Sequence, residues 1–376
     1  MDPSPRILII RLSALGDIIH ALPLLAALRA RFPKGHLGWI VEPAGAQLLE
    51  GHPLLDTLHV FPRQAWRESK LGALRGPLKD LLREVRAQHY DIAIDAQGLT
   101  KSAVWGWLAR APRRIGFAAG AGAGELAPLL ANERVTPPPE ARHVVERNLA
   151  LLAPLGIARP EPIAFPVHLP PAALGKADEI LADPDGRAAP LVIVNPGAGW
   201  ATKIWPPDRL GQLARTLAET RACRVAVAWG PGEEPLAEAV LAAAGQGDAV
   251  NFKARILPPA PGVYALPPTR FVELGAVIAR ARLFVGGDTG PTHLAAALGV
   301  PTVAMMGPLD ARRNGPYGAH CVTIQHATPR RAPLWRNHRR WCDPLTDLRL
   351  VTVEEVLAAC LSALERFTPS LKETTQ

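Results

Sequence analysis

The segment 283–307, LFVGGDTGPTHLAAALGVPTVAMMG, combines residue types that suit the binding of an anion. An apolar run typical of a buried strand leads into a glycine-rich polar turn and then into a predicted helix. Pro291 suits the first turn of that helix, and Gly299 suits its C-terminal cap. The free N–H groups at such a helix start favour a phosphate. The alternative is an ordinary tight turn in which Asp288 or Thr289 caps the helix.

A second glycine turn, NPGAG at 195–199, also follows an apolar strand. Gly197 and Gly199 allow the backbone to approach a ligand closely, and Lys203, with Thr202 beside it, could neutralise a diphosphate. The pattern GxxxxGK[ST] is absent, which does not favour an ordinary ATPase. The alternative interpretation of Lys203 is a solvated lysine on a loop.

The third turn after a strand lies in VAVAWGPGEEP at 225–235. Glu233 and Glu234 fall in the first turn of the next predicted helix, where acidic residues are favoured by the helix dipole. Alternatively, one of the two carboxylates accepts hydrogen bonds from ribose hydroxyls. The sequence alone does not decide between the helix-dipole role and the ribose-binding role, nor which glutamate would bind the ribose.

Near the N-terminus, RLSALGDIIHALPLLAAL places Asp17 at the start of a helix expected over 18–31, where Gly16 permits a tight turn after the strand. Asp17 can be a helix cap, or a carboxylate that accepts a proton from an attacking hydroxyl. The two roles are compatible, because a capping carboxylate stays ionised at neutral pH.

Basic residues form two groups that could meet an anionic partner. Arg63 and Arg67 flank Trp66 in a predicted loop after a strand and are candidates for binding an anionic substrate. The cations from Lys70 onward alternate with acidic residues, and a helix over 70–88 would present them to solvent. The second group contains Arg330, Arg331, Arg336, His338, Arg339 and Arg340, with Trp335 and Trp341 between them, and could meet phosphates or an anionic membrane.

Composition limits the classes of protein that remain. The chain has 376 residues and a formal charge of +8, with no apolar run long enough to span a membrane and no secretory signal pattern. Its four cysteines are scattered without metal-ligand spacing, which suits free thiols in the cytoplasm. Few Phe and Tyr residues and no nucleic-acid module argue against a nucleic-acid partner.

Strands and helices alternate along the whole chain, which predicts an α/β protein with two doubly wound, mostly parallel sheets. The proline-rich stretch 160–171 is the expected linker between them. Ligands bind such sheets at the carboxyl ends of the strands, and each motif above follows a strand. The expected strands are 6–12, 36–43, 56–62, 91–97 and 113–119 in the first half, and 190–199, 223–230, 283–288, 300–306 and 321–325 in the second.

With these residues assembled, the chain resembles the lipopolysaccharide heptosyltransferases of glycosyltransferase family 9, most closely those of the heptosyltransferase I type. The stretches that carry the resemblance are 6–33, 90–103 (YDIAIDAQGLTKSA), 195–214 (NPGAGWATKIWPPDRLGQLA) and 286–308. It implies a GT-B fold, with two Rossmann-like domains facing across a cleft. Residues 1–165 would bind the acceptor and 172–350 the nucleotide sugar, and a helix and tail at 351–376 would pack back on the first domain.

The resemblance also implies a reaction: inverting transfer of L-glycero-D-manno-heptose from ADP-heptose to a Kdo residue of a lipid A precursor. The protein would be a monomer associated peripherally with the anionic cytoplasmic face of the inner membrane, with no cofactor and no metal. Asp17 would be the general base and Lys203 the catalytic contact to the donor diphosphate. The other implied donor residues are Gly197, Gly199, Thr202, Glu233, Glu234, Asp288, Thr289, Gly290, Pro291 and His293, and the acceptor residues are Arg63, Arg67 and Gln97.

Three alternatives remain open from the sequence. One is a paralogue with another acceptor or sugar, such as a heptosyltransferase II-like enzyme. Another is a sugar-nucleotide epimerase of GT-B-like fold, and the third is a non-catalytic sugar-nucleotide binder or polyanion-binding scaffold. Ala14 and the acceptor loop depart from the family pattern, since serine or threonine is common at the first position and the loop is usually more basic.

Overall fold

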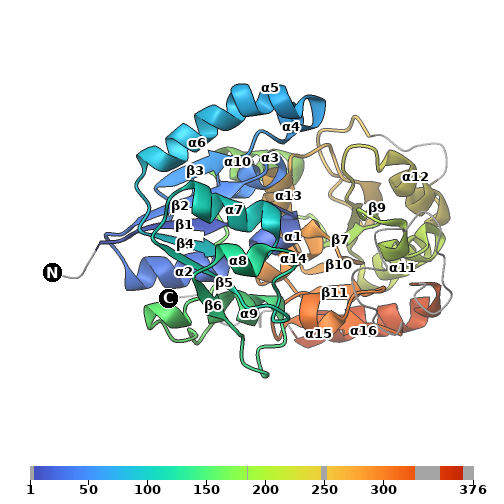
Figure 1. Cartoon of the computed structure of the whole chain (residues 1–376). Coiled ribbons are helices and arrows are strands. Elements are labelled where there is room, and N and C mark those ends of the chain that lie inside the picture. Colours follow the sequence, from blue (N-terminus) through green and yellow to red (C-terminus); the bar gives the residue numbers. More distant parts are fainter. Residues whose placement is uncertain (1–3, 184, 247–251, 327–347, 367–376) are drawn as a thin grey trace, which may run out of the picture. The chain divides into compact units, whose positions relative to one another are not determined.

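The computed structural model describes residues 4–183, 185–246, 252–326 and 348–366. The chain divides into two compact units, Met1–His168 and Leu169–Gln376, and this division falls inside the proline-rich stretch expected to be the linker. Each unit contains one six-stranded sheet, and the paired strands of the described residues are parallel in both sheets (Figure 1).

The sheet of the first unit has the strand order β3-β2-β1-β4-β5-β6. The central strand β1 pairs with β2 on one side and with β4 on the other, so that Ile9 lies between Trp39 and Ile94. The chain changes direction across the sheet between β1 and β4, which makes their carboxyl ends the expected ligand position. The strands are β1 (Arg6–Ile10), β2 (His36–Val41), β3 (Thr57–Val60), β4 (Ile92–Asp95), β5 (Arg113–Phe117) and β6 (Glu133–Val135).

Two of the differences between the observed and the expected helices of the first unit lie between residues 63 and 87. Arg63 and Arg67 lie on a short helix, α4 (Arg63–Glu68), and not in a loop. The long helix expected over 70–88 is two helices, α5 (Lys70–Arg75) and α6 (Pro77–Ala87), because Pro77 has no N–H to continue the first. The remaining helices are α1 (Leu15–Ile19), α2 (Leu22–Arg31), α3 (Pro43–Leu49), α7 (Thr100–Leu108), α8 (Ala127–Leu130) and α9 (Val144–Ala150).

The sheet of the second unit has the order β12-β11-β10-β7-β8-β9, and its direction changes between β7 and β10. The carboxyl ends of these two strands lead into the 195–199 turn and the 286–289 turn, which therefore share one edge of the sheet. The sequence did not predict β9, a short strand at the edge of the sheet. The strands are β7 (Leu191–Asn195), β8 (Arg224–Val227), β9 (Gly262–Ala265), β10 (Leu283–Gly287), β11 (Thr302–Met305) and β12 (Cys321–Ile324).

The last described helix packs within the second unit. α16 (Val353–Arg366) lies in the second unit, and its side chains Val356, Cys360 and Ala363 are part of that unit's core. Their spacing places them on one face of the helix, which packs on α11 and on β10–β12. The other helices of the second unit are α10 (Pro171–Ile180), α11 (Pro207–Arg221), α12 (Glu234–Ala243), α13 (Phe271–Ile278), α14 (Gly290–Ala297) and α15 (Ala311–Asn314).

Among the described helices, none combines the length and the apolar character that a bilayer-spanning segment needs.

Candidate functional site

The second unit brings Lys203, Asp288 and His293 together at the carboxyl end of its sheet. Lys203 Nζ lies 2.7 Å from Asp288 Oδ2, and His293 Nε2 lies 3.0 Å from Asp288 Oδ1. The Asp288 and His293 side chains are buried, and the Lys203 ammonium also lies over the Trp200 ring, 4.9 Å from its centroid. Lys203 is thus a fixed cation and not a solvated lysine on a loop.

The charge state of Asp288 follows from these contacts. Burial by itself raises the pKa of the carboxyl, but the hydrogen bond from His293 and the charges of His293 and Lys203 outweigh it and lower the pKa to about 2. Asp288 is therefore a carboxylate at neutral pH, and its partners are side chains. The simple helix-cap interpretation of Asp288 is wrong, because both carboxylate oxygens are directed to Lys203 and His293.

Two glycines explain how Lys203 reaches this position. A Cβ on Gly287, at the end of β10, would lie 2.7 Å from the carbonyl oxygen of Lys203. A Cβ on Gly307, just after β11, would lie 2.8 Å from the carbonyl oxygen of Thr202. The backbone of the short 3-10 turn Ala201–Lys203 therefore crosses the ends of these strands at a distance that only glycine permits.

A third glycine, Gly197, allows the 195–199 turn to lie close to the loop that carries Glu233. A Cβ on Gly197 would lie 2.2 Å from the carboxyl atoms of Glu233, and the Gly230 N–H donates to Glu233 Oε2 at 2.9 Å. Glu233 therefore lies against the 195–199 turn, whereas Glu234 is the first residue of α12. Of the two glutamates that the sequence left open, Glu233 is the one in contact with the glycine turn.

The start of α14 follows the prediction closely. The helix begins at Gly290 with Pro291 in its first turn, and Gly299 has a positive φ of 78° just after its end. Thr289 occupies the N-cap position without a side-chain capping bond, and its hydroxyl lies 3.1 Å from the Thr292 hydroxyl.

The hydroxyl of Thr202, beside Lys203, has no hydrogen-bond partner in the part of the chain that the structure describes. This hydroxyl is buried. A buried hydroxyl without a hydrogen-bond partner is energetically unfavourable unless a ligand or a water molecule forms the missing hydrogen bond. The three loop segments of this edge therefore present a buried hydroxyl, a fixed ammonium and the N-terminus of a helix.

In the first unit, Asp17 lies at the carboxyl end of β1 and is held from two sides. Arg11 Nη2 lies 2.7 Å from Asp17 Oδ1, and the Ala14 N–H donates to Asp17 Oδ2 at 3.2 Å. The Arg11 side chain is 8 % exposed and that of Asp17 is 41 % exposed, so solvent reaches the carboxylate. Asp17 thus keeps the capping role, and its partner Arg11 is a residue that the sequence analysis missed. A basic residue at the end of a buried strand is the signal that could have found it.

Gln97 connects the carboxyl ends of β1 and β4. Its Oε1 accepts a hydrogen bond from the Leu12 N–H at 2.9 Å, and its own N–H donates to Asp95 Oδ1 at 3.0 Å. Burial raises the pKa of Asp95 to about 6, although the hydrogen bond from the Gly98 N–H and the Arg11 charge act in the opposite direction. The amide of Gln97 therefore supports the turn that carries Asp17.

The two arginines predicted to bind the acceptor have different surroundings. Arg63 forms an ion pair with the buried carboxylate of Glu42, and Lys101 Nζ lies 3.5 Å from the other oxygen of that carboxylate. Arg67 is exposed at the end of α4. Glu42 and Lys101 were not singled out by the sequence, and they place a partly exposed cationic cluster next to Ser13, whose Oγ lies 3.4 Å from Lys101 Nζ.

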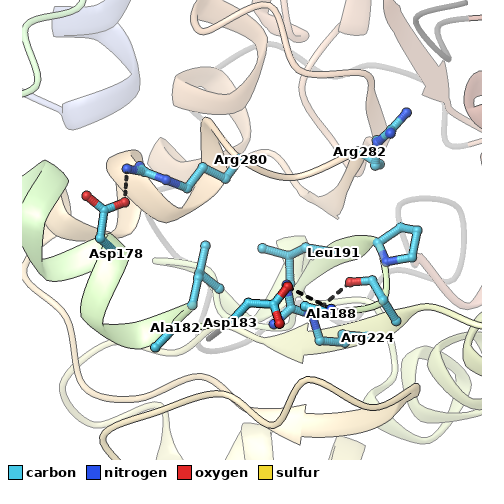
Figure 2. Close-up of a pocket in the computed structure, with 11 residues that line it drawn as sticks. Asp178, Ala182, Asp183, Ala188, Leu191, Arg224, Arg280 and Arg282 are labelled. Carbon is cyan, nitrogen blue, oxygen red and sulfur yellow. Dashed lines mark hydrogen bonds and ion pairs between the residues drawn. The ribbon is translucent and has the colours of Figure 1, made fainter. Parts of the chain in front are cut away.

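A separate pocket of about 460 Å³ lies where the strands of the second sheet begin (Figure 2). Arg280 pairs with Asp178, and Asp183 accepts hydrogen bonds from the N–H groups of Arg187 and Ala188. In Figure 2, Arg282 points away from both carboxylates. The pocket opens at the edge opposite the motifs, and three arginines and two carboxylates are among the residues that line it.

Two expectations from the sequence concern a metal site and the basic cluster near the C-terminus. Within the described ranges there is no group of three or more His, Cys, Asp or Glu residues able to hold a metal ion. The basic cluster 330–341, with its two tryptophans, lies outside the described residues.

The protein has two Rossmann-like units, and a fixed cation and a helix start lie at the switch point of the second sheet. This combination defines an α/β protein of the GT-B class. The family model for glycosyltransferase family 9 (heptosyltransferase) matches residues 78–338. The chain belongs to this family and is a glycosyltransferase.

Curated and solved relatives agree with this assignment. Lipopolysaccharide heptosyltransferase 1 of Pseudomonas aeruginosa is 32% identical over 322 residues, which cover 85% of this chain and 83% of the relative. The protein of the same name from Escherichia coli K12 is 28% identical over 83% of this chain and 91% of its own length. The structure of E. coli heptosyltransferase WaaC with ADP superposes with a TM-score of 0.74 at 25% identity, covering 95% of this chain and 99% of that one.

Proposed function

We propose that this protein transfers L-glycero-D-manno-heptose from ADP-heptose to a Kdo residue of a lipid A precursor, with inversion at the anomeric carbon. A similar chain was solved as E. coli heptosyltransferase WaaC with ADP-2-deoxy-2-fluoro heptose, with a TM-score of 0.71 at 25% identity. This supports a nucleotide-sugar donor, while the acceptor is inferred from resemblance to heptosyltransferase 1 proteins.

The observation that carries the proposal is the Lys203–Asp288–His293 arrangement beside the start of α14. The ion pair at 2.7 Å holds the Lys203 ammonium at Asp288, two residues before the first residue of α14, and the buried hydroxyl of the adjacent Thr202 has no hydrogen bond among the described residues. The departing ADP gains negative charge on its diphosphate as the bond to the sugar breaks. Positive groups already fixed at that place stabilise the charge without further reorganisation.

Glu233 and the glycine turn would bind the nucleoside end of the donor. The carboxylate at Gly197 has one oxygen engaged by the Gly230 N–H, and its charge suits acceptance of hydrogen bonds from ribose hydroxyls. Glu234, on the first turn of α12, remains in the donor set as a second candidate for the same contact.

Asp17 would act as the general base in the first unit. Its carboxylate is accessible and is oriented by Arg11 and by the Ala14 N–H, so it can accept the proton of an attacking hydroxyl. The oxygen then attacks the anomeric carbon as ADP leaves from the opposite face, which inverts the configuration. No covalent intermediate is needed in this sequence.

The cationic cluster of Arg63, Arg67 and Lys101 would bind the carboxylate or phosphate groups of the acceptor. A lipid-linked acceptor requires the protein to act at a membrane surface, and we propose peripheral association of a monomer with the cytoplasmic face of the inner membrane. The formal charge of +8 suits that anionic surface.

The test is a transfer assay with the purified protein, ADP-heptose and two acceptors, one ending in Kdo and one ending in heptose. Heptose transfer to the Kdo acceptor, with release of ADP, is the expected result. Transfer only to the heptose acceptor would indicate a heptosyltransferase II-like enzyme. Conversion of the donor without any acceptor would indicate an epimerase.

A further inference from the structure

Three large apolar side chains of the first unit are exposed where α7 and α8 lie side by side (Figure 1). Trp107 is 58% exposed, Leu126 60% and Leu129 72%. The Leu126 N–H donates to Thr100 Oγ1 at 3.1 Å, and Trp107 follows Thr100 by two turns on the same face of α7. These three side chains therefore form one surface, which we name the α7–α8 patch.

The grouping is unusual for this molecule. The other large apolar side chains exposed within the described residues are Val60, Ile256 and Leu350, which lie on separate parts of the chain. Single exposed apolar residues need no explanation, whereas a cluster of a tryptophan and two leucines commonly marks an interaction surface.

Arginines border the α7–α8 patch. Arg134 Nε donates to the Pro128 carbonyl at 2.7 Å, and Arg114 Nε donates to the Leu130 carbonyl at 2.9 Å, so both guanidinium groups lie against α8. Arg110 is exposed three residues after Trp107. Glu125 is the acidic neighbour of Leu126, and the three arginines outnumber it.

We propose that the α7–α8 patch docks this protein onto an anionic lipid bilayer. Trp107 and the two leucines enter the boundary between headgroups and acyl chains, while the arginine border meets lipid phosphates. The charge pattern selects this occupant, because an apolar centre within a basic border complements an anionic headgroup layer. The inference rests on the proposed function in taking a lipid-linked acceptor as the reason for docking.

The same helix links the patch to the candidate acceptor residues. α7 begins at the carboxyl end of β4, where Lys101 lies beside Ser13 and Glu42. Docking through the later part of α7 therefore anchors the helix that carries Lys101. A lipid-linked acceptor in the same bilayer then needs to be extracted only a short way to reach these residues.

Cosedimentation with vesicles tests the proposal. The wild-type protein should bind vesicles of phosphatidylcholine and phosphatidylglycerol, and bind vesicles of phosphatidylcholine alone much more weakly. The double variant Trp107→Ser/Leu129→Ser should lose binding by at least about tenfold, because it removes most of the inserted apolar surface. Arg110→Gln should weaken binding to the anionic vesicles by about fivefold and reduce its salt dependence.

The matched control is Ile256→Ser, an exposed apolar residue of the second unit that should leave vesicle binding unchanged. Unchanged thermal melting of each variant establishes that the fold is intact. Wild-type binding by the double variant, or no binding of the wild-type protein to anionic vesicles, overturns the proposal. A dimer without vesicles that the double variant disrupts also overturns it, in favour of a second copy of the chain.

Transfer to a deacylated, water-soluble acceptor separates this proposal from the proposed function. The double variant should retain wild-type transfer to that acceptor while it loses vesicle binding. Absence of transfer by the wild-type protein would refute the proposed function and leave the vesicle result interpretable on its own.

Discussion

Replacing Asp288 with asparagine should destabilise the protein by an amount that depends on pH in a defined way. The substitution keeps the size of the side chain and removes the charge that pairs with Lys203 and His293. The contacts with His293 and Lys203 lower the pKa of Asp288 from 3.8 to about 2 in the folded state. A difference of one pKa unit corresponds to about 1.36 kcal/mol, so the variant should lose about 2 kcal/mol at pH 7.

The sign follows from proton linkage. Because the folded-state pKa is lower than the unfolded one, the stabilising contribution is present above about pH 4 and is lost as the pH falls towards 2. The difference between wild type and Asp288→Asn should therefore shrink from about 2 kcal/mol at pH 7 to about 1 kcal/mol at pH 3.

Urea unfolding at a series of pH values measures this difference, with both units present and the transition of the second unit followed. The matched control is Asp178→Asn, whose ion pair with Arg280 has a carboxylate side chain 65% exposed and should contribute under about 1 kcal/mol. A difference for Asp288→Asn that is constant from pH 7 to pH 3, or no larger than the control, would refute the assignment of a buried, stabilising carboxylate.

Three further predictions concern the same loops and the Asp17 turn. Lys203→Met should weaken ADP binding by about 10- to 100-fold in a calorimetric titration, since a charge-assisted contact is lost, and unchanged affinity would remove Lys203 from the donor site. Gly197→Ala should lower ADP affinity by about tenfold because its Cβ meets the Glu233 carboxylate at 2.2 Å, whereas Gly199→Ala, with no atom within 4 Å, should not. The wild-type protein should lose up to about 3 kcal/mol of stability as the pH rises from 4 to 6, because the pKa of Asp95 is raised from 3.8 to about 6 and ionisation of this carboxyl favours the unfolded state. Asp95→Asn should not show this loss, and parallel pH profiles of stability for the two proteins would contradict the prediction.

Periodicity and turn chemistry were sufficient to predict the two parallel sheets and the position of the motifs on them. The segment from β10 to β11 is the clearest case, because the apolar strands, Pro291 and Gly299 each favour the structure observed. The errors lie where a local signal is short. The strand β9 has four residues at a sheet edge, and the helix expected over 18–31 is broken before α2, where Pro23 cannot donate a backbone hydrogen bond.

The partners of the site residues could not be predicted, because they depend on contacts distant in sequence. Lys203 and Asp288 are joined by a backbone crossing that Gly287 and Gly307 allow, and no local pattern shows which loops will meet. Arg11 was overlooked for a similar reason. Its role depends on the turn that folds Asp17 back onto the end of β1.

The helix α16 shows what periodicity alone can predict about packing. Its apolar residues predicted an amphipathic helix correctly, but the surface that covers them is set by the three-dimensional position of α11 and the second sheet. Periodicity specifies that a face will be buried and leaves open against which neighbour.

The central claim is that Asp17 deprotonates the acceptor while the second unit binds the donor, and one comparison tests it most directly. Heptose transfer by wild type and by Asp17→Ala is measured with ADP-heptose and the Kdo acceptor, alongside calorimetric titration of each protein with ADP. The prediction is a fall in kcat of at least about 100-fold with unchanged ADP affinity, since loss of a general base typically costs that much. Turnover that persists in Asp17→Ala would contradict the assignment of the base.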